Sequence, residues 1–264
     1  MIQFGSTKLH YGIYLKRLFH LTVVLLYAVL ILSMMIIPYK YPNIFEAHRI
    51  IKHGYKYRNF LFSIWATGLQ FTYFCLAFSI DCLEIHGGQK AMKICDKLHS
   101  FASYLLFAFV FPVSAHVFIV FWSIYAWDRE YIYPLKLDTV APFFLNHIFH
   151  TFPPILSVMY MLTCNKKVPS LKSTLTGLIS LLTLYGFIFM YVKLVHNEWV
   201  YLLFEVFSDT GVKILLAYCA LGSLPFLFLG HKINEVLTDL KQNGFFDYVF
   251  NISVNTSELH EKMS

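Results

Sequence analysis

The chain has 264 residues, of which 58% are hydrophobic and 19% aromatic, whereas only 14% are charged. A soluble domain carries about a quarter charged residues, so most of this chain must face lipid or other helices. The net charge of +6 is spread over the connecting segments and does not form the basic patch that nucleic acid requires.

Several apolar runs approach or exceed the roughly 18 residues that a helix needs to cross a bilayer. In chain order the predicted spans are residues 18–38, 60–83, 102–126, 139–163, 173–195 and 211–230. The first follows Lys16 and Arg17 without a small-residue cleavage site, so we interpret it as a true span and not as a signal peptide. The sequence therefore predicts an all-α fold, a polytopic membrane bundle of about six transmembrane helices. Residues 1–235 form a single domain, and residues 236–264 are predicted to be a partly disordered cytoplasmic tail.

Basic residues in the connecting segments indicate the orientation, because short cytoplasmic loops carry an excess of Lys and Arg. The N-terminal arm, the 84–99 and 164–172 loops and the tail hold more of them than the opposite loops. Both termini are therefore predicted to be cytoplasmic, in a multi-pass protein of the endoplasmic reticulum or the plasma membrane. The opposite 39–59 loop is itself basic and also carries apolar side chains, which favours a position along the lipid headgroups.

The segment Asp138–Pro154 places His147 and His150 three residues apart on one face of a predicted span. An ionisable side chain inside a span is costly and marks a functional site by default. Pro153 and Pro154 follow directly, and proline lacks the N–H that a continuing helix requires. The helix is therefore predicted to kink just after His150, beside a polar pocket within the bilayer.

Three interpretations of the two histidines compete. Both can be structural, with hydrogen bonds to side chains such as Asn146 and Thr151. Both can be metal ligands, but a site needs a third or fourth ligand, and neither the acids nor the cysteines show such a set. We therefore predict no metal, haem or other cofactor. In the third interpretation a histidine is the acid–base catalyst for a hydroxyl nucleophile on another span, with Ser63 and Thr67 as the candidates.

A long motif distinguishes the third and fourth predicted spans. Residues 111–155, FPVSAHVFIVFWSIYAWDREYIYPLKLDTVAPFFLNHIFHTFPPI, contain the elements FPV, FW-x-x-YA-x-DRE-x-IYP and LNH-x-x-H-T. This pattern resembles the signature of the family of androgen-induced gene 1 and androgen-dependent TFPI-regulating proteins, and a weaker similarity extends over roughly residues 55–235. The resemblance implies an integral membrane hydrolase of bioactive lipids, namely fatty acid esters of hydroxy fatty acids.

The resemblance also implies a catalytic pair, a threonine in an early span and a histidine in the LNH-x-x-H element. It places the histidine at His150. Counting back from Gln70, it places the hydroxyl at Ser63, so that a serine stands where the family has a threonine. Thr67 is the fallback nucleophile if the register is off by one helical turn.

The mechanism predicted from this pair is ester hydrolysis within the membrane. His150 takes the proton of Ser63, whose oxygen attacks the acyl carbonyl, and Asn146 and His147 are the candidate oxyanion donors or supporting residues. The predicted partners are membrane lipids and the fatty-acyl ester substrate. The alternative is a non-enzymatic membrane protein that binds lipid or serves as a scaffold.

Overall fold

A computed structural model describes residues 3–163 and 168–243, and within these ranges the chain contains helices and no strand. The α-helices are α1 Gln3–Lys40, α2 Pro42–Ala47, α3 Arg49–Lys56, α4 Phe62–His86, α5 Gln89–Leu105, α6 Phe111–Asp128, α7 Phe143–His150, α8 Phe152–Thr163, α9 Leu171–His196, α10 Asp209–Leu221 and α11 Leu224–Gln242. A π-helical turn, η2 Leu106–Val110, joins α5 to α6. Short 3-10 helices are η1 Arg58–Phe60, η3 Arg129–Tyr131, η4 Leu135–Thr139 and η5 Leu202–Glu205.

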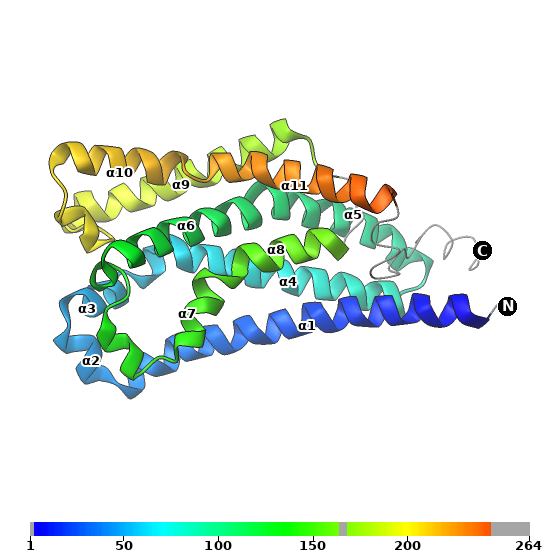
Figure 1. The fold of residues 1–264 in the computed structure, drawn as a ribbon, viewed down its shortest axis with the longest axis horizontal. Helices are drawn as coiled ribbons and strands as arrows, with labels where there is room; N and C mark the ends of the chain where they lie inside the picture. The colour runs from blue at the N-terminus through cyan, green and yellow to red at the C-terminus, as the bar shows by residue number, and fades with distance from the viewer. Residues whose placement is uncertain (1–2, 164–167, 244–264) are drawn as a thin grey trace.

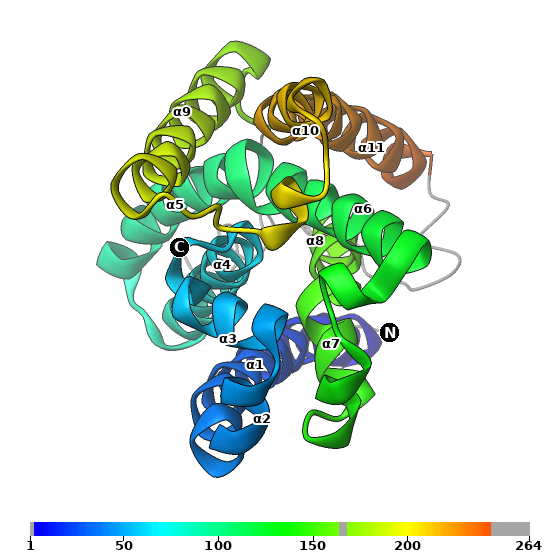
Figure 2. The same cartoon turned by 90° about the vertical axis from the view of Figure 1, so that its left-hand side faces the viewer.

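The long helices run along the long axis of the molecule, and α11 ends on the side where α1 begins (Figure 1). The connections 41–61, 129–142 and 197–208 gather at the opposite end, and we call them the cap. Viewed from the cap, α4 lies at the centre, with α1 on one side and α5 and α6 on the other (Figure 2). The two ends of the described chain therefore lie on the same side, and which side faces the cytoplasm stays a prediction.

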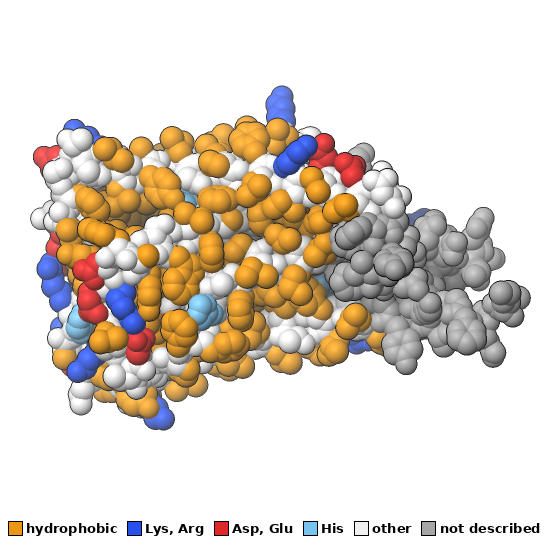
Figure 3. Space-filling model, in the orientation of Figure 1, with side chains coloured by type: hydrophobic (Ala, Val, Ile, Leu, Met, Phe, Trp, Pro, Cys, Tyr) orange, Lys and Arg blue, Asp and Glu red, His pale blue; other side chains and the backbone are white. Residues whose placement is uncertain are grey.

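Five helical segments of the described chain are long and apolar enough to cross a membrane. They are Tyr14–Lys40, Phe62–His86, Ala91–Tyr131, Leu171–His196 and Asp209–Gln242. Hydrophobic side chains cover the length of the bundle, whereas charged side chains gather toward its two ends (Figure 3). The chain is thus a polytopic helical membrane protein, and five of the predicted spans are confirmed. The predicted tail is helical up to Gln242, and its part from residue 244 onward lies outside the described residues.

The remaining predicted span, 139–163, is not one continuous helix. The structure divides it into α7 and α8, with Thr151 between them, and Figure 1 shows α7 turned away from the axis of α8. The N–H of Thr151 still donates to the carbonyl of His147 at 2.8 Å. Pro153 and Pro154 have no N–H with which to continue the pattern. The predicted kink after His150 is confirmed, and neither piece is long enough to span a bilayer alone.

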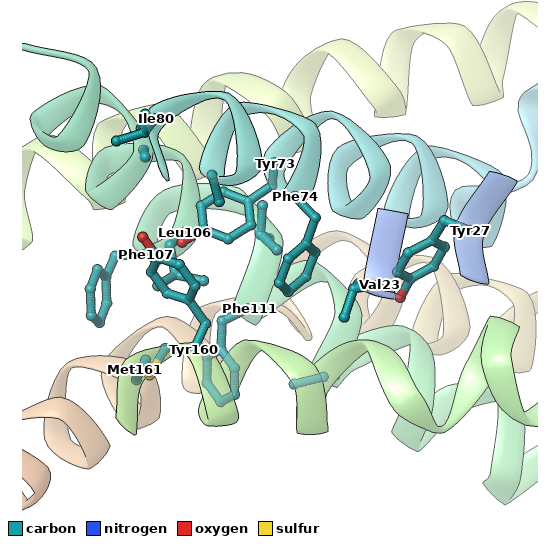
Figure 4. Packing of buried hydrophobic residues seen from close by; sticks show 14 of the residues in the cluster. Val23, Tyr27, Tyr73, Phe74, Ile80, Leu106, Phe107, Phe111, Tyr160 and Met161 are labelled. Atoms are coloured by element: carbon teal, nitrogen blue, oxygen red, sulfur yellow. The ribbon is translucent and has the colours of Figure 1, made fainter. Parts of the chain in front are cut away.

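Aromatic side chains form the centre of the bundle (Figure 4). Tyr27 of α1 and Tyr73 and Phe74 of α4 are fully buried, and the rings of Tyr73 and Tyr160 of α8 meet edge-on with centroids 5.1 Å apart. Because lipid is as apolar as these side chains, close packing rather than exclusion of water holds such helices together. This packing fixes α4 against α1 and α8.

A buried ionic cluster lies toward the end of α4 that is remote from the cap. Asp81 is 2.5 Å from His20 Nδ1 and 2.9 Å from Lys16 Nζ, both of α1, and Glu84 is 2.6 Å from His99 Nε2 of α5. Asp81 follows Ser63 by 18 residues of one helix, which corresponds to about 27 Å. This carboxylate links α4 to α1 and is too far away to act at the cap end.

Candidate active site

A cavity of about 720 Å³ lies in the half of the bundle next to the cap. Its walls come from α1, α3, α4, α6, α7, α9, α10 and the cap segments, and they are mostly aliphatic and aromatic. Ser63, Asn146 and His150 all line it. The structure thus brings three of the sequence-predicted site residues to one apolar cavity, although Ser63 and Asn146 are 83 positions apart in the chain.

His150 is held in one orientation at the end of α7. Its side chain is only 7% exposed, and its ring stacks on Phe121 of α6 with the centroids 3.5 Å apart. Its Nδ1 lies 2.7 Å from Oδ1 of Asn146, one helical turn earlier. Because a carbonyl oxygen only accepts, Nδ1 carries the proton and Nε2 keeps its lone pair. This is the tautomer that a general base needs.

Asn146 has an unused donor. The side chain is 3% exposed, and its Nδ2 is buried without a hydrogen-bond partner among the described residues. A buried polar group without a partner lowers the free energy of unfolding by about 1–3 kcal/mol, so its presence here calls for an explanation. This amide belongs to a residue that lines the cavity and orients the histidine, which makes it a candidate donor to an oxyanion.

His147 does not line the cavity. Its Nδ1 is 2.9 Å from Thr151 Oγ1, and its ring stacks on Trp122, whose Nε1 donates to the same hydroxyl at 3.1 Å. On a helix with about 100° per residue, the side chains of Asn146 and His150 point in directions about 40° apart. The side chain of His147 is turned about 100° from Asn146 and about 60° from His150. A cavity met by Asn146 and His150 is therefore turned away from His147. The interpretation of His147 as an oxyanion donor has no support from this geometry, and its contacts fit a structural role.

The two nucleophile candidates differ in position. The hydroxyl of Thr67 is buried and donates to the carbonyl of Ser63 at 3.0 Å, and Thr67 does not line the cavity. Ser63, one turn earlier, is half-buried and does line it. Ser63 also lies in the first turn of α4, where the helix dipole favours negative charge on its oxygen. The geometry therefore favours Ser63, the position to which the family resemblance points.

Two tyrosines hold the first turn of α4, a feature that the sequence reasoning missed. The Phe62 N–H donates to the hydroxyl of Tyr201 at 2.8 Å, and the hydroxyl of Tyr185 donates to the Phe60 carbonyl at 2.9 Å. The sequence does contain a signal for this contact, the apolar Leu61 at the N-cap of α4. Leucine has no side-chain acceptor for the unpaired N–H groups in the first turn of the helix. An acceptor from elsewhere was therefore to be expected.

Gln70 links the helix of Ser63 to the break beside His150. Its Nε2 donates to the carbonyl of Pro153 at 2.8 Å and to Ser157 Oγ at 3.0 Å. Gln70 and Ser157 are both fully buried. In the sequence Gln70 served only to fix the register, whereas the structure makes it a positioning residue between α4 and α8.

Ion pairs connect cap segments that are distant in the sequence. Lys56 Nζ is 2.9 Å from Glu198 Oε2, and Arg49 Nη2 is 2.5 Å from Glu205 Oε2. The hydrogen bond from Lys56 lowers the pKa of the Glu198 carboxyl below its usual value. These pairs fix the 197–208 segment, which carries Tyr201, over the start of α4.

Comparison with known proteins places this arrangement in a family. The profile of the FAR-17a/AIG1-like protein family matches residues 15–235. The chain belongs to this family. Ser63, Asn146 and His150 all lie within the part that matches the FAR-17a/AIG1-like profile.

Curated relatives of this FAR-17a/AIG1-like chain are moderately similar to it. The androgen-induced gene 1 protein of Homo sapiens is 33% identical over 158 residues, which cover 60% of this chain and 66% of that protein. The androgen-dependent TFPI-regulating protein of Mus musculus is 31% identical over 169 residues, which cover 63% and 71%. The match therefore spans about two thirds of the length of these relatives. No solved structure matches the chain significantly.

Proposed function

We propose that the protein is an integral membrane hydrolase of lipid esters, in particular fatty acid esters of hydroxy fatty acids. Ser63 is the nucleophile and His150 the general base. The observation that carries the proposal is the apolar cavity that both residues line, in which Asn146 holds His150 with Nε2 unprotonated. A cavity of this size and apolar character suits an acyl chain.

The first half of the reaction forms an acyl-enzyme. Nε2 of His150 takes the proton of Ser63 Oγ, and this oxygen attacks the acyl carbonyl carbon of the ester. The oxyanion accepts a hydrogen bond from Nδ2 of Asn146. When the tetrahedral intermediate collapses, the bond between the acyl carbon and the hydroxy fatty acid oxygen breaks. That oxygen leaves with the proton from His150.

The second half regenerates the enzyme. Water gives a proton to Nε2 of His150 and attacks the acyl carbon, and the bond to Ser63 Oγ then breaks. The proton returns to Ser63, and the products are one fatty acid and one hydroxy fatty acid. The apolar walls strengthen each of these electrostatic contacts because few water dipoles compete with them.

The test is hydrolysis of a branched fatty acid ester of a hydroxy fatty acid by purified protein in detergent or vesicles. Ser63→Ala and His150→Ala should each lower kcat at least about 100-fold, the usual scale of acid–base and nucleophilic catalysis. Thr67→Ala is the matched control, since its hydroxyl bonds a backbone carbonyl and does not line the cavity. Activity lost in Thr67→Ala and kept in Ser63→Ala would assign the nucleophile to Thr67.

The second candidate function is binding of a lipid without turnover. It is favoured by one observation, that the described side-chain hydrogen bonds include none between Ser63 and His150. A lipophilic fluorophosphonate separates the two functions. The hydrolase labels covalently at Ser63 and the label disappears in Ser63→Ala, whereas a lipid-binding protein or scaffold stays unlabelled and still takes up fatty acid.

A further inference from the structure

The cavity has a single charged residue in its wall. Among the described residues that line it there is no Asp or Glu, and Arg58 is the only Lys or Arg. Arg58 lies in η1, directly before the helix that carries Ser63. An apolar cavity with one cation at its cap end is the complement of an amphiphile whose polar end is an anion.

Three other cations of the cap are neutralised by carboxylates, and Arg58 is not. Arg49 pairs with Glu205, Lys56 with Glu198 and Arg129 with Asp138. No salt bridge within the described ranges includes Arg58. Its guanidinium donates to the Tyr55 carbonyl at 2.9 Å and lies 4.2 Å from the centroid of the Tyr55 ring. A guanidinium has five N–H donors, so this contact orients it and leaves donors for a ligand.

We propose that Arg58 binds the carboxylate of the substrate and thereby selects lipid esters that carry a free acid. This inference rests on the proposed function and adds the residue that recognises the head of the substrate. A guanidinium pairs with a carboxylate through two parallel hydrogen bonds, which a neutral ester cannot reproduce.

The spacing along the chain limits the substrate. Arg58 precedes Ser63 by five residues, so their Cα atoms are at most about 18 Å apart even in a fully extended chain. The carboxylate and the scissile ester must therefore lie on the same side of the cavity, joined by one alkyl chain. Arg58 then acts as a positioning residue that places the ester carbonyl against Ser63.

The test compares the free acid of a branched fatty acid ester of a hydroxy fatty acid with its methyl ester, following cleavage of the internal ester bond. The wild type should prefer the acid at least about 10-fold in kcat/KM, the usual worth of a charge-assisted hydrogen bond. Arg58→Gln should lower kcat/KM for the acid about 10- to 100-fold, mostly through KM, and change the methyl ester less than about 3-fold. Arg58→Lys keeps the charge but not the two parallel hydrogen bonds, so it should retain only part of the preference. Lys52→Gln is the control, because Lys52 is an exposed cation of the same cap that does not line the cavity.

A binding assay separates this inference from the hydrolase assignment. In the Ser63→Ala background, a diazirine fatty acid should photolabel the protein more strongly than its methyl ester, and Arg58→Gln should abolish that difference. This readout needs no turnover, so it tests Arg58 even if no ester is hydrolysed. A wild type that does not distinguish acid from methyl ester overturns the proposal. So does an Arg58→Gln variant that loses both substrates equally, which would assign Arg58 to bilayer phosphates or to the cap fold.

Discussion

Asn146 is the residue at which catalysis and stability should separate most clearly. Its Oδ1 holds Nδ1 of His150 at 2.7 Å, while its Nδ2 is buried without a partner in the described structure. We expect Asn146→Ala to lower kcat about 100- to 1,000-fold, because one oxyanion donor is worth about 2.7–4 kcal/mol in the transition state. The misoriented histidine adds to this loss.

The same substitution should change stability little. Asn146→Ala leaves the Nδ1–H of His150 without an acceptor, which costs about 1–3 kcal/mol, but it also removes the orphan Nδ2, which cost a similar amount. The two terms oppose each other, so the free energy of unfolding should fall by no more than about 1 kcal/mol. A variant that is folded, binds fatty acid normally and hydrolyses ester poorly is the expected result.

The assay measures kcat, fatty acid binding and thermal stability in the same detergent for the wild type, Asn146→Ala and His147→Ala. His147 is the control, since it is adjacent in sequence and bonds Thr151 away from the cavity. His147→Ala should keep kcat within about 3-fold of the wild type, because its contacts are structural. The reasoning is refuted if Asn146→Ala keeps more than a third of wild-type kcat, or if its activity and stability fall together as in a misfolded protein.

Two further predictions concern the cap. Tyr201→Phe removes the acceptor of the Phe62 N–H and should destabilise the protein by about 1–2 kcal/mol, measured as a lower thermal midpoint. The control is Thr183→Val, a substitution at a cavity-lining position of α9. Glu198→Gln should lower the midpoint at neutral pH. Because the pKa of Glu198 is lowered in the folded state, its contribution is present above the usual carboxyl pKa and is lost as the pH falls through the lowered value. The difference between wild type and Glu198→Gln should therefore shrink on acidification, and a difference that persists at pH 3 contradicts this account.

The long helices could be predicted from the sequence because hydropathy is averaged over a whole span, so a single polar residue changes the average only a little. The break after His150 could also be predicted, since the missing N–H groups of Pro153 and Pro154 are a local chemical fact. The contact between Asn146 and His150 follows from their spacing of four residues. All of these features depend on residues that are close together in the chain.

The cap and the shape of the cavity depend on residues that are far apart in the chain. Lys56 and Glu198 are separated by 142 residues, and Phe62 and Tyr201 by 139. Nothing in the local sequence selects these partners, which are set by the packing of α4 against α9. The position of His147 outside the cavity was missed for a related reason. The spacing of His147 and His150 puts both on one side of the helix, but it does not show which part of that side lines the cavity.

The proposed role of Ser63 would require a rigid cap, because Ser63 lies at the start of a helix. A nucleophile inside a long helix would be fixed by the helix itself, whereas the first turn of α4 begins with an uncapped apolar residue, Leu61. Tyr201 supplies the missing acceptor, and Gln70 fixes the same helix two turns deeper against Pro153, beside the helix of His150. The helix of Ser63 is thus held at its start by the 197–208 segment of the cap and two turns deeper by α8. A catalytic pair needs its atoms held to within about 0.5 Å, and these two contacts, from a loop and from a buried amide, are the ones that can hold it.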